Sequence, residues 1–228
     1  VYGQKEESVF DDNGIIIQQI QNIKFKGLSW YLTRKKLERI INQLYEEEEI
    51  DLVEAPDWTG ITSFIQPNKC PVIIKLHGSD TYFCHLEDRP VKFLNRYYEK
   101  KALQKAHGLL SVSRYTADLT KKIFSLNKEF TIIPNSVDLE SFSNHEIESE
   151  ENTVLYFGTL IRKKGALELP LIFNEVYKNN NNAKLILIGR DASDILSGNT
   201  STWKMMQELF DTRAIQNVTY LGSVPYNE

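Results

Sequence analysis

The sequence predicts an α/β protein made of two tandem units, each built on a parallel sheet. Short β-branched and apolar runs alternate along the chain with longer segments of helical periodicity, a pattern typical of β-α-β units. The alternation stops once, at the polar and acidic stretch SNHEIESEENT, and then restarts. We therefore expect a first unit over 1–143, a linker over 144–152 and a second unit over 153–228, with both units incomplete. Parallel sheets of this kind are expected to carry helices on both faces.

The first unit is predicted to alternate from 13 to 135. Helix 30–49 follows from Trp30, Leu37, Ile40, Ile41 and Leu44 at helical spacing. We expect the next helix to be closed by Gly108. The predicted strands are 13–23, 50–56, 71–76, 109–113 and 130–135, and the predicted helices are 30–49, 90–108 and 114–125.

The second unit repeats the alternation after the linker. Its predicted strands are 153–158, 184–189 and 218–222, and its predicted helices are 165–179 and 202–212. Each strand of this unit ends in glycine, at Gly158, Gly189 and Gly222. Because open parallel sheets bind ligands beyond the carboxyl ends of their strands, a ligand is expected at three strand ends of the chain, HGSD at 77–80, GTLIRKKG at 158–165 and GRDAS at 189–193.

Composition excludes several function classes. The net charge of −4 gives no bulk attraction to nucleic acid or to anionic lipid, so a bound anion has to be held locally. Cys70 and Cys84 form neither a C-x-x-C pair nor a zinc cage, and we expect both to be reduced thiols. No cationic leader or membrane-spanning apolar run is found, so the chain is predicted to be cytoplasmic. The carboxylates are scattered, which predicts no metal site.

The turn GTLIRKKG, 158–165, has the makings of a diphosphate site. Gly158 allows a close backbone approach, and a following helix N-terminus offers unpaired N–H groups. Arg162, Lys163 and Lys164 add positive charge, and a bound anion would relieve the unfavourable position of cations at a helix N-terminus. The spacing matches neither a Walker loop nor the dinucleotide turn. The alternative is a loop of solvated cations, and the sequence leaves the two about even.

Four motifs in order resemble a known family. The stretches IIPNSVDLESF, VLYFGTLIRKKGALEL, LILIGRD and VTYLGSVPYNE resemble the retaining, glycogen-synthase-like group of GT-B nucleotide-sugar glycosyltransferases, called family four. The resemblance extends from about residue 50 to residue 228. It implies a GT-B fold with two Rossmann-like units and metal-independent transfer of a sugar to an acceptor hydroxyl with retention.

The resemblance implies roles for individual residues. Lys164 corresponds to the lysine that holds the donor diphosphate. The family usually has an arginine after the first glycine, where this chain has Thr159, so Arg162 or Lys163 would have to replace it. His77, in KLHGSD, corresponds to the active-site histidine. Gly189 and Arg190 correspond to a loop that lies beside the nucleotide, and Ser223 and Val224 to a segment that lies against its base or ribose.

The resemblance also implies partners. The donor would be a nucleotide sugar such as a UDP- or GDP-sugar with no further cofactor, and the acceptor a glycan or a lipid-linked glycan, in polysaccharide or glycoconjugate synthesis. Peripheral contact at the inner membrane face stays open, and nucleic acid is not expected. The family's glycine-rich first loop and its E-x7-E pair are not found in this sequence, so we expect this chain by itself to be an inactive fragment.

Two alternatives stay open. A non-hydrolysing nucleotide-sugar epimerase shares the architecture, although the KKG turn favours a transferase. A non-catalytic nucleotide-binding module would bind nucleotide without consuming a sugar donor.

Other features are predicted to be structural. We expect His107 to be a cation at a helix end, and His85 and His145 to be surface residues. The acidic run 46–49 is expected to be solvated, and the tyrosines at 97 and 98, like the tryptophans, to be at least half-buried.

Overall fold

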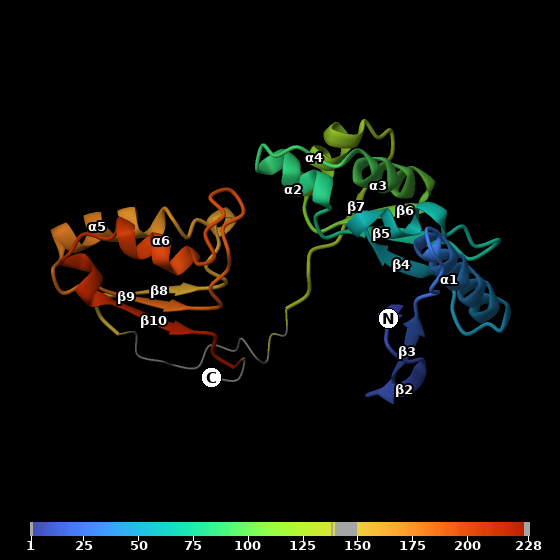
Figure 1. The fold of residues 1–228 in the computed structure, drawn as a ribbon, viewed down its shortest axis with the longest axis horizontal. Coiled ribbons are helices and arrows are strands. Elements are labelled where there is room, and N and C mark those ends of the chain that lie inside the picture. The colour runs from blue at the N-terminus through green and yellow to red at the C-terminus, as the bar shows by residue number, and fades with distance from the viewer. Residues whose placement is uncertain (1, 138, 140–149, 226–228) are drawn as a thin grey trace. The chain divides into compact units, whose positions relative to one another are not determined.

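Two parallel sheets form the framework of the protein, one in each of the units into which the chain divides, Val1–Asp138 and Leu139–Glu228 (Figure 1). The computed structural model describes residues 2–137, 139 and 150–225. Most of the predicted linker, 144–149, lies outside the described residues. The two α/β units confirm the predicted fold class.

The sheet of the first unit has the strand order β4-β5-β6-β7, all parallel. The strands are β4 Val53–Pro56, β5 Val72–Leu76, β6 Gly108–Ser111 and β7 Thr131–Ile132. The helices are α1 Ser29–Glu46, α2 Asp80–Leu86, α3 Phe93–Lys105 and α4 Arg114–Phe124, with a 3-10 segment η1 at Trp58–Phe64. Buried Ile74 and Leu76 of β5 pack with Leu103 of α3 and Phe124 of α4.

A small three-stranded sheet precedes α1, and the sequence interpretation found only one of its strands. Its order is β1-β3-β2, with β1 Tyr2–Gln4, β2 Ser8–Asp12 and β3 Ile15–Gln21. The β2–β3 hairpin turns at Asn13 and Gly14, both with positive φ. An Asn-Gly pair between apolar runs is a strong hairpin signal, so this turn could have been predicted.

Three local predictions were wrong. Gly108 does not close a helix, because α3 ends at Lys105 and Gly108 begins β6. His107 does not act as a cation at the helix end, since its Nδ1 accepts a hydrogen bond from the Val72 N–H at 3.1 Å. Tyr97, Trp30 and Trp58 are exposed. Tyr97 lies outward because α3 packs through its opposite side, where Glu99 and Leu103 are buried.

Other expectations hold. Cys70 and Cys84 are free and buried, residues 46–49 are exposed, and so is His85. His145 lies outside the described residues.

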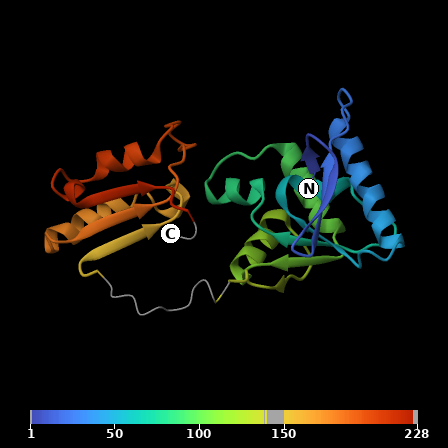
Figure 2. The ribbon, with the colours of Figure 1, turned by 90° about the horizontal axis from the view of Figure 1, so that it is seen from below.

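The sheet of the second unit has the order β10-β9-β8, also parallel, and Figure 2 shows these strands side by side. The strands are β8 Thr153–Phe157, β9 Lys184–Ile188 and β10 Val218–Gly222. The helices are α5 Leu169–Asn179 and α6 Thr202–Leu209, with 3-10 turns η2 at Arg162–Lys164 and η3 at Ala214–Asn217.

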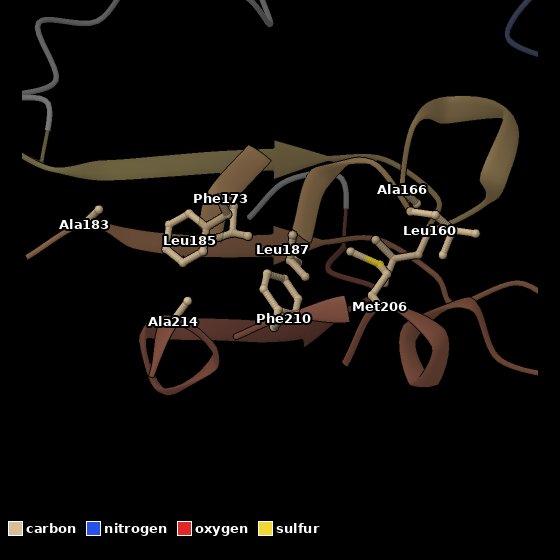
Figure 3. Packing of buried hydrophobic residues seen from close by; sticks show 10 residues of the cluster. Leu160, Ala166, Phe173, Ala183, Leu185, Leu187, Met206, Phe210 and Ala214 are labelled. Atoms are coloured by element: carbon tan, nitrogen blue, oxygen red, sulfur yellow. The ribbon is translucent and has the colours of Figure 1, made fainter. Parts of the chain in front are cut away.

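Both helices of this unit cover the same face of its sheet (Figure 1). Leu185 and Leu187 of β9 pack there against Phe173 of α5 and Met206 of α6 (Figure 3). Full burial of each such side chain stabilises the fold by about 1.5–3 kcal/mol. The expected cover on both faces is therefore not what the described residues show. Strands laid down in sequence order with right-handed crossovers place every helix on one side.

Candidate functional site

His77 lies in the loop that follows β5, where the sequence predicted a catalytic residue. Its side chain is exposed, and it borders a cavity of about 240 Å³ at the carboxyl ends of the strands. The following Gly78 has φ +96°, and a Cβ there would come within 2.6 Å of the Phe83 ring. The cavity is lined by Leu76, His77, Gly78, Tyr82, Phe83, Val112, Thr116 and Asn135.

Two residues from the end of β4 flank His77, and the sequence interpretation missed both. The buried Asp57 carboxylate accepts a hydrogen bond from the His77 backbone N–H at 3.0 Å. Burial raises the pKa of Asp57, although the backbone N–H groups of His77 and Gly78 oppose that rise. The Trp58 ring meets the His77 ring edge to face, with 6.1 Å between centroids. PDWTG follows a strand, so the strand-end rule could have flagged it.

The loop between β5 and α2 is fixed by a second buried carboxylate. Glu99 of α3 is fully buried and accepts hydrogen bonds from the backbone N–H groups of Asp80 and Thr81, at 3.1 and 3.2 Å, and from the Thr81 hydroxyl. Burial raises its pKa, and these donors oppose the rise. The start of α2 is thus already satisfied by Glu99 and by the Ser79 cap.

In the second unit, the structure brings Lys164 and Gly158 together. The Lys164 Nζ lies 3.5 Å from the point where a Cβ on Gly158 would be, so the ammonium group lies over the end of β8. Gly158 has φ +145°, a conformation that favours glycine. With the described residues Lys164 forms no ion pair within 4.0 Å. An exposed cation is therefore held beside a glycine backbone at the carboxyl edge of the sheet.

The turns that carry Gly158 and Gly189 are in contact. A Cβ on Gly189 would come within 2.0 Å of the Gly158 carbonyl oxygen. The Gly158 N–H donates to the Ile188 carbonyl at 2.8 Å, and the Gly189 N–H donates to the Gly222 carbonyl at 2.7 Å. These bonds join the ends of β8, β9 and β10 into one surface.

Arg162 is engaged within the protein. Its Nε and Nη2 donate to the two carboxylate oxygens of Asp194, both at 2.8 Å. The pKa of Asp194 is held well below its usual range, first by Arg162 and then by hydrogen bonds from Ser197. Arg162 thus anchors the turn to the loop after β9, and Lys164 is the cation that faces the Gly158 backbone.

The remaining predicted residues surround this edge. Lys163, Arg190 and Ser223 are exposed, and Val224 is half-buried. The sequence suggested that the three cations lie directly at the N-terminus of a helix, and this prediction was wrong. They form η2, which Gly165 closes with φ +76°, and α5 begins only at Leu169 with Pro170 in its first turn.

Among the described residues, no group of three or more His, Cys, Asp or Glu side chains could hold a metal ion. None of the described helices is both long and apolar enough to cross a membrane.

The match to a protein-family model shows the family of the chain. The model of Glycosyltransferase Family 4 matches residues 2–141, more than half of the chain. The chain belongs to glycosyltransferase family 4. No curated protein sequence matches this family 4 chain significantly.

Solved structures share the fold of this family 4 chain. HepE of Anabaena, solved with UDP and glucose, has a TM-score of 0.61 and 17% sequence identity, and the match covers 93% of this chain and 57% of HepE. A mutant of S. aureus TarM, solved with fondaparinux, α-GlcNAc-glycerol and UDP, has a TM-score of 0.50 and 14% identity, covering 86% of this chain and 37% of TarM. The chain thus spans little more than half of HepE.

Proposed function

We propose that the protein transfers a sugar from a nucleotide diphosphate donor to an acceptor hydroxyl, with retention at the anomeric carbon and without a metal. The donor is a UDP- or GDP-sugar, and the acceptor is a glycan or a lipid-linked glycan of a polysaccharide or glycoconjugate pathway. The enzyme works in the cytoplasm, with peripheral contact at the inner membrane face. Family membership, the free thiols and the fold support this proposal.

The position of Lys164 carries the proposal. Departure of a diphosphate places negative charge on its oxygens, and a cation fixed beside them lowers the barrier. Lys164 is held over the Gly158 backbone, where a phosphate could approach closely because no Cβ is in the way. Arg162 supports the same turn through Asp194, and Lys163 adds positive charge beside it. Gly189, Arg190, Ser223 and Val224 border this edge and contact the nucleotide.

The proposed role of His77 is to contact the sugar of the donor. His77 borders the cavity at the carboxyl ends of the first-unit strands, and its backbone is fixed by Asp57. In this role it contacts the transferred sugar and the leaving phosphate. The UDP bound to HepE and to TarM supports a uridine nucleotide as the first donor to test.

Nucleotide binding tests the proposal. Titration calorimetry should detect UDP or GDP binding to the protein, and Lys164→Ala should weaken it about tenfold or more, because a hydrogen bond to a charged group is worth about 1.5–3 kcal/mol. In the intact enzyme, the same change should lower the rate of sugar transfer about a hundredfold. Lys178→Ala is the matched control, since Lys178 is an exposed lysine of α5 paired with Glu175. Equal affinity in both variants would exclude the diphosphate role of Lys164.

A further inference from the structure

Trp58 presents an exposed indole beside His77. More than half of its surface, 55%, faces solvent, although it follows β4 at the ligand-binding edge of the sheet. An exposed indole at a ligand-binding edge offers a flat apolar surface on which an apolar face of a ligand can pack. Its ring lies beside His77, which borders the 240 Å³ cavity.

The backbone around Trp58 is held firmly. Asp57, which precedes it, is only 4% exposed and bonds to the His77 N–H. Thr59 and Gly60, which follow it, have φ +50° and +56°, and positive φ is costly for a β-branched residue such as Thr59. A Cβ at Gly60 would come within 2.2 Å of the Tyr98 carbonyl carbon of α3. The backbone is therefore constrained on both sides of Trp58, by the hydrogen bond to Asp57 and by the close approach of Gly60 to α3.

We propose that Trp58 is the acceptor platform of this enzyme and selects an acceptor with a pyranose ring. This inference rests on the proposed transferase function and names the acceptor class for the same site. The axial C–H groups of a pyranose form an apolar face that packs on an indole, while its hydroxyls point outward. Asn135 and Thr116 line the adjoining cavity and supply polar groups for such hydroxyls.

Intrinsic fluorescence isolates the residue, because the chain has three tryptophans, at 30, 58 and 203. Methyl glycosides of glucose, galactose, mannose and N-acetylglucosamine are titrated to about 50 mM, far above a millimolar dissociation constant. At least one glycoside should change the emission of the wild type. The change should disappear in Trp58→Phe and persist in Trp30→Phe and Trp203→Phe.

A second variant tests binding itself. In saturation-transfer NMR, Trp58→Ala should lose the glycoside signal, whereas Phe93→Ala should keep it, since Phe93 is an exposed aromatic of α3 that does not line the cavity. No response to any glycoside, or a response that survives in Trp58→Phe, overturns the inference. UDP titration of the same proteins separates the two proposals. Retained UDP binding without a glycoside response refutes the platform alone, and absent nucleotide binding refutes the transferase proposal.

Discussion

Gly189 shows how one missing side chain shapes the nucleotide edge. The Gly189 backbone lies so close to the Gly158 carbonyl oxygen that a Cβ added at Gly189 would be 2.0 Å from that oxygen. The two turns cannot easily move apart, because the Gly158 N–H and the Gly189 N–H both donate hydrogen bonds to the ends of neighbouring strands. The contact between the two turns therefore depends on glycine at 189.

Gly189→Ala should destabilise the second unit by about 3 kcal/mol or more, since the clash adds to the backbone strain of positive φ. Gly198→Ala is the matched control. Gly198 also has a positive φ, +73°, but nothing lies within 4 Å of its added Cβ, so only about 1–2 kcal/mol should be lost. Urea unfolding followed by circular dichroism measures both. Equal losses would mean that the contact between the turns is not needed.

Single residues differ in how far the sequence predicts them. The juxtaposition of Lys164 and Gly158 was predictable, because both belong to one short turn. The partner of Arg162 was not, since Asp194 lies 32 positions away in a loop without regular periodicity. The position of Asp57 and Trp58 directly after a strand was predictable. Their contacts with His77 were not, because they depend on the pairing of β4 with β5.

At the scale of elements, η2 is held by an ion pair between two loops. Asp194 is 3% exposed and Arg162 is 39% exposed, so the bridge is partly shielded from water. Ser197 adds hydrogen bonds from its hydroxyl and its N–H to the same carboxylate. The turn that presents Lys164 is thereby fixed to the loop after β9.

Asp194→Asn should lower the free energy of unfolding at pH 7 by about 2 kcal/mol, less than for a fully buried pair because Arg162 is partly solvated. The folded state lowers the pKa of Asp194. Its contribution is therefore complete above the unfolded pKa near 3.9 and decreases as pH falls below it. The difference between wild type and variant should shrink from pH 6 to about pH 3. Urea titrations at both pH values measure this.

Glu208→Gln provides the control for that pH series, since Glu208 is an exposed carboxylate of α6. Its free energy of unfolding should follow the wild type at both pH values. A difference for Asp194→Asn that stays constant with pH would show that the loss comes from packing and not from charge.

Elements were predictable where periodicity was regular. The strands β5, β8 and β9 and the helix α4 lie within the predicted ranges, and α1 begins one residue before its predicted range, since their apolar positions repeat over enough residues. Short elements set by capping were missed. The helix α2 depends on the Ser79 cap and on Glu99, which comes from α3, and η2 depends on the left-handed Gly165.

At the scale of the whole chain, strand order decides which faces are covered. Both parallel sheets run in sequence order, β4-β5-β6-β7 and β8-β9-β10, so right-handed crossovers place the helices that connect the strands of each sheet on one side. In the second unit the opposite face exposes Leu155, Phe157 and Leu221. Sequence patterns show that these residues are apolar, but they do not show which of the two faces the helices take.

This asymmetry predicts opposite outcomes for two leucines of one sheet. Leu155→Thr should change the free energy of unfolding by less than about 0.5 kcal/mol and reduce binding of an apolar dye, because Leu155 is 59% exposed. Leu185→Thr, on the covered face at 0% exposure, should cost about 3 kcal/mol or more. Urea denaturation and dye fluorescence measure both. A large loss for Leu155→Thr would mean that this face is packed in solution and that the helices do not define the only core of the unit.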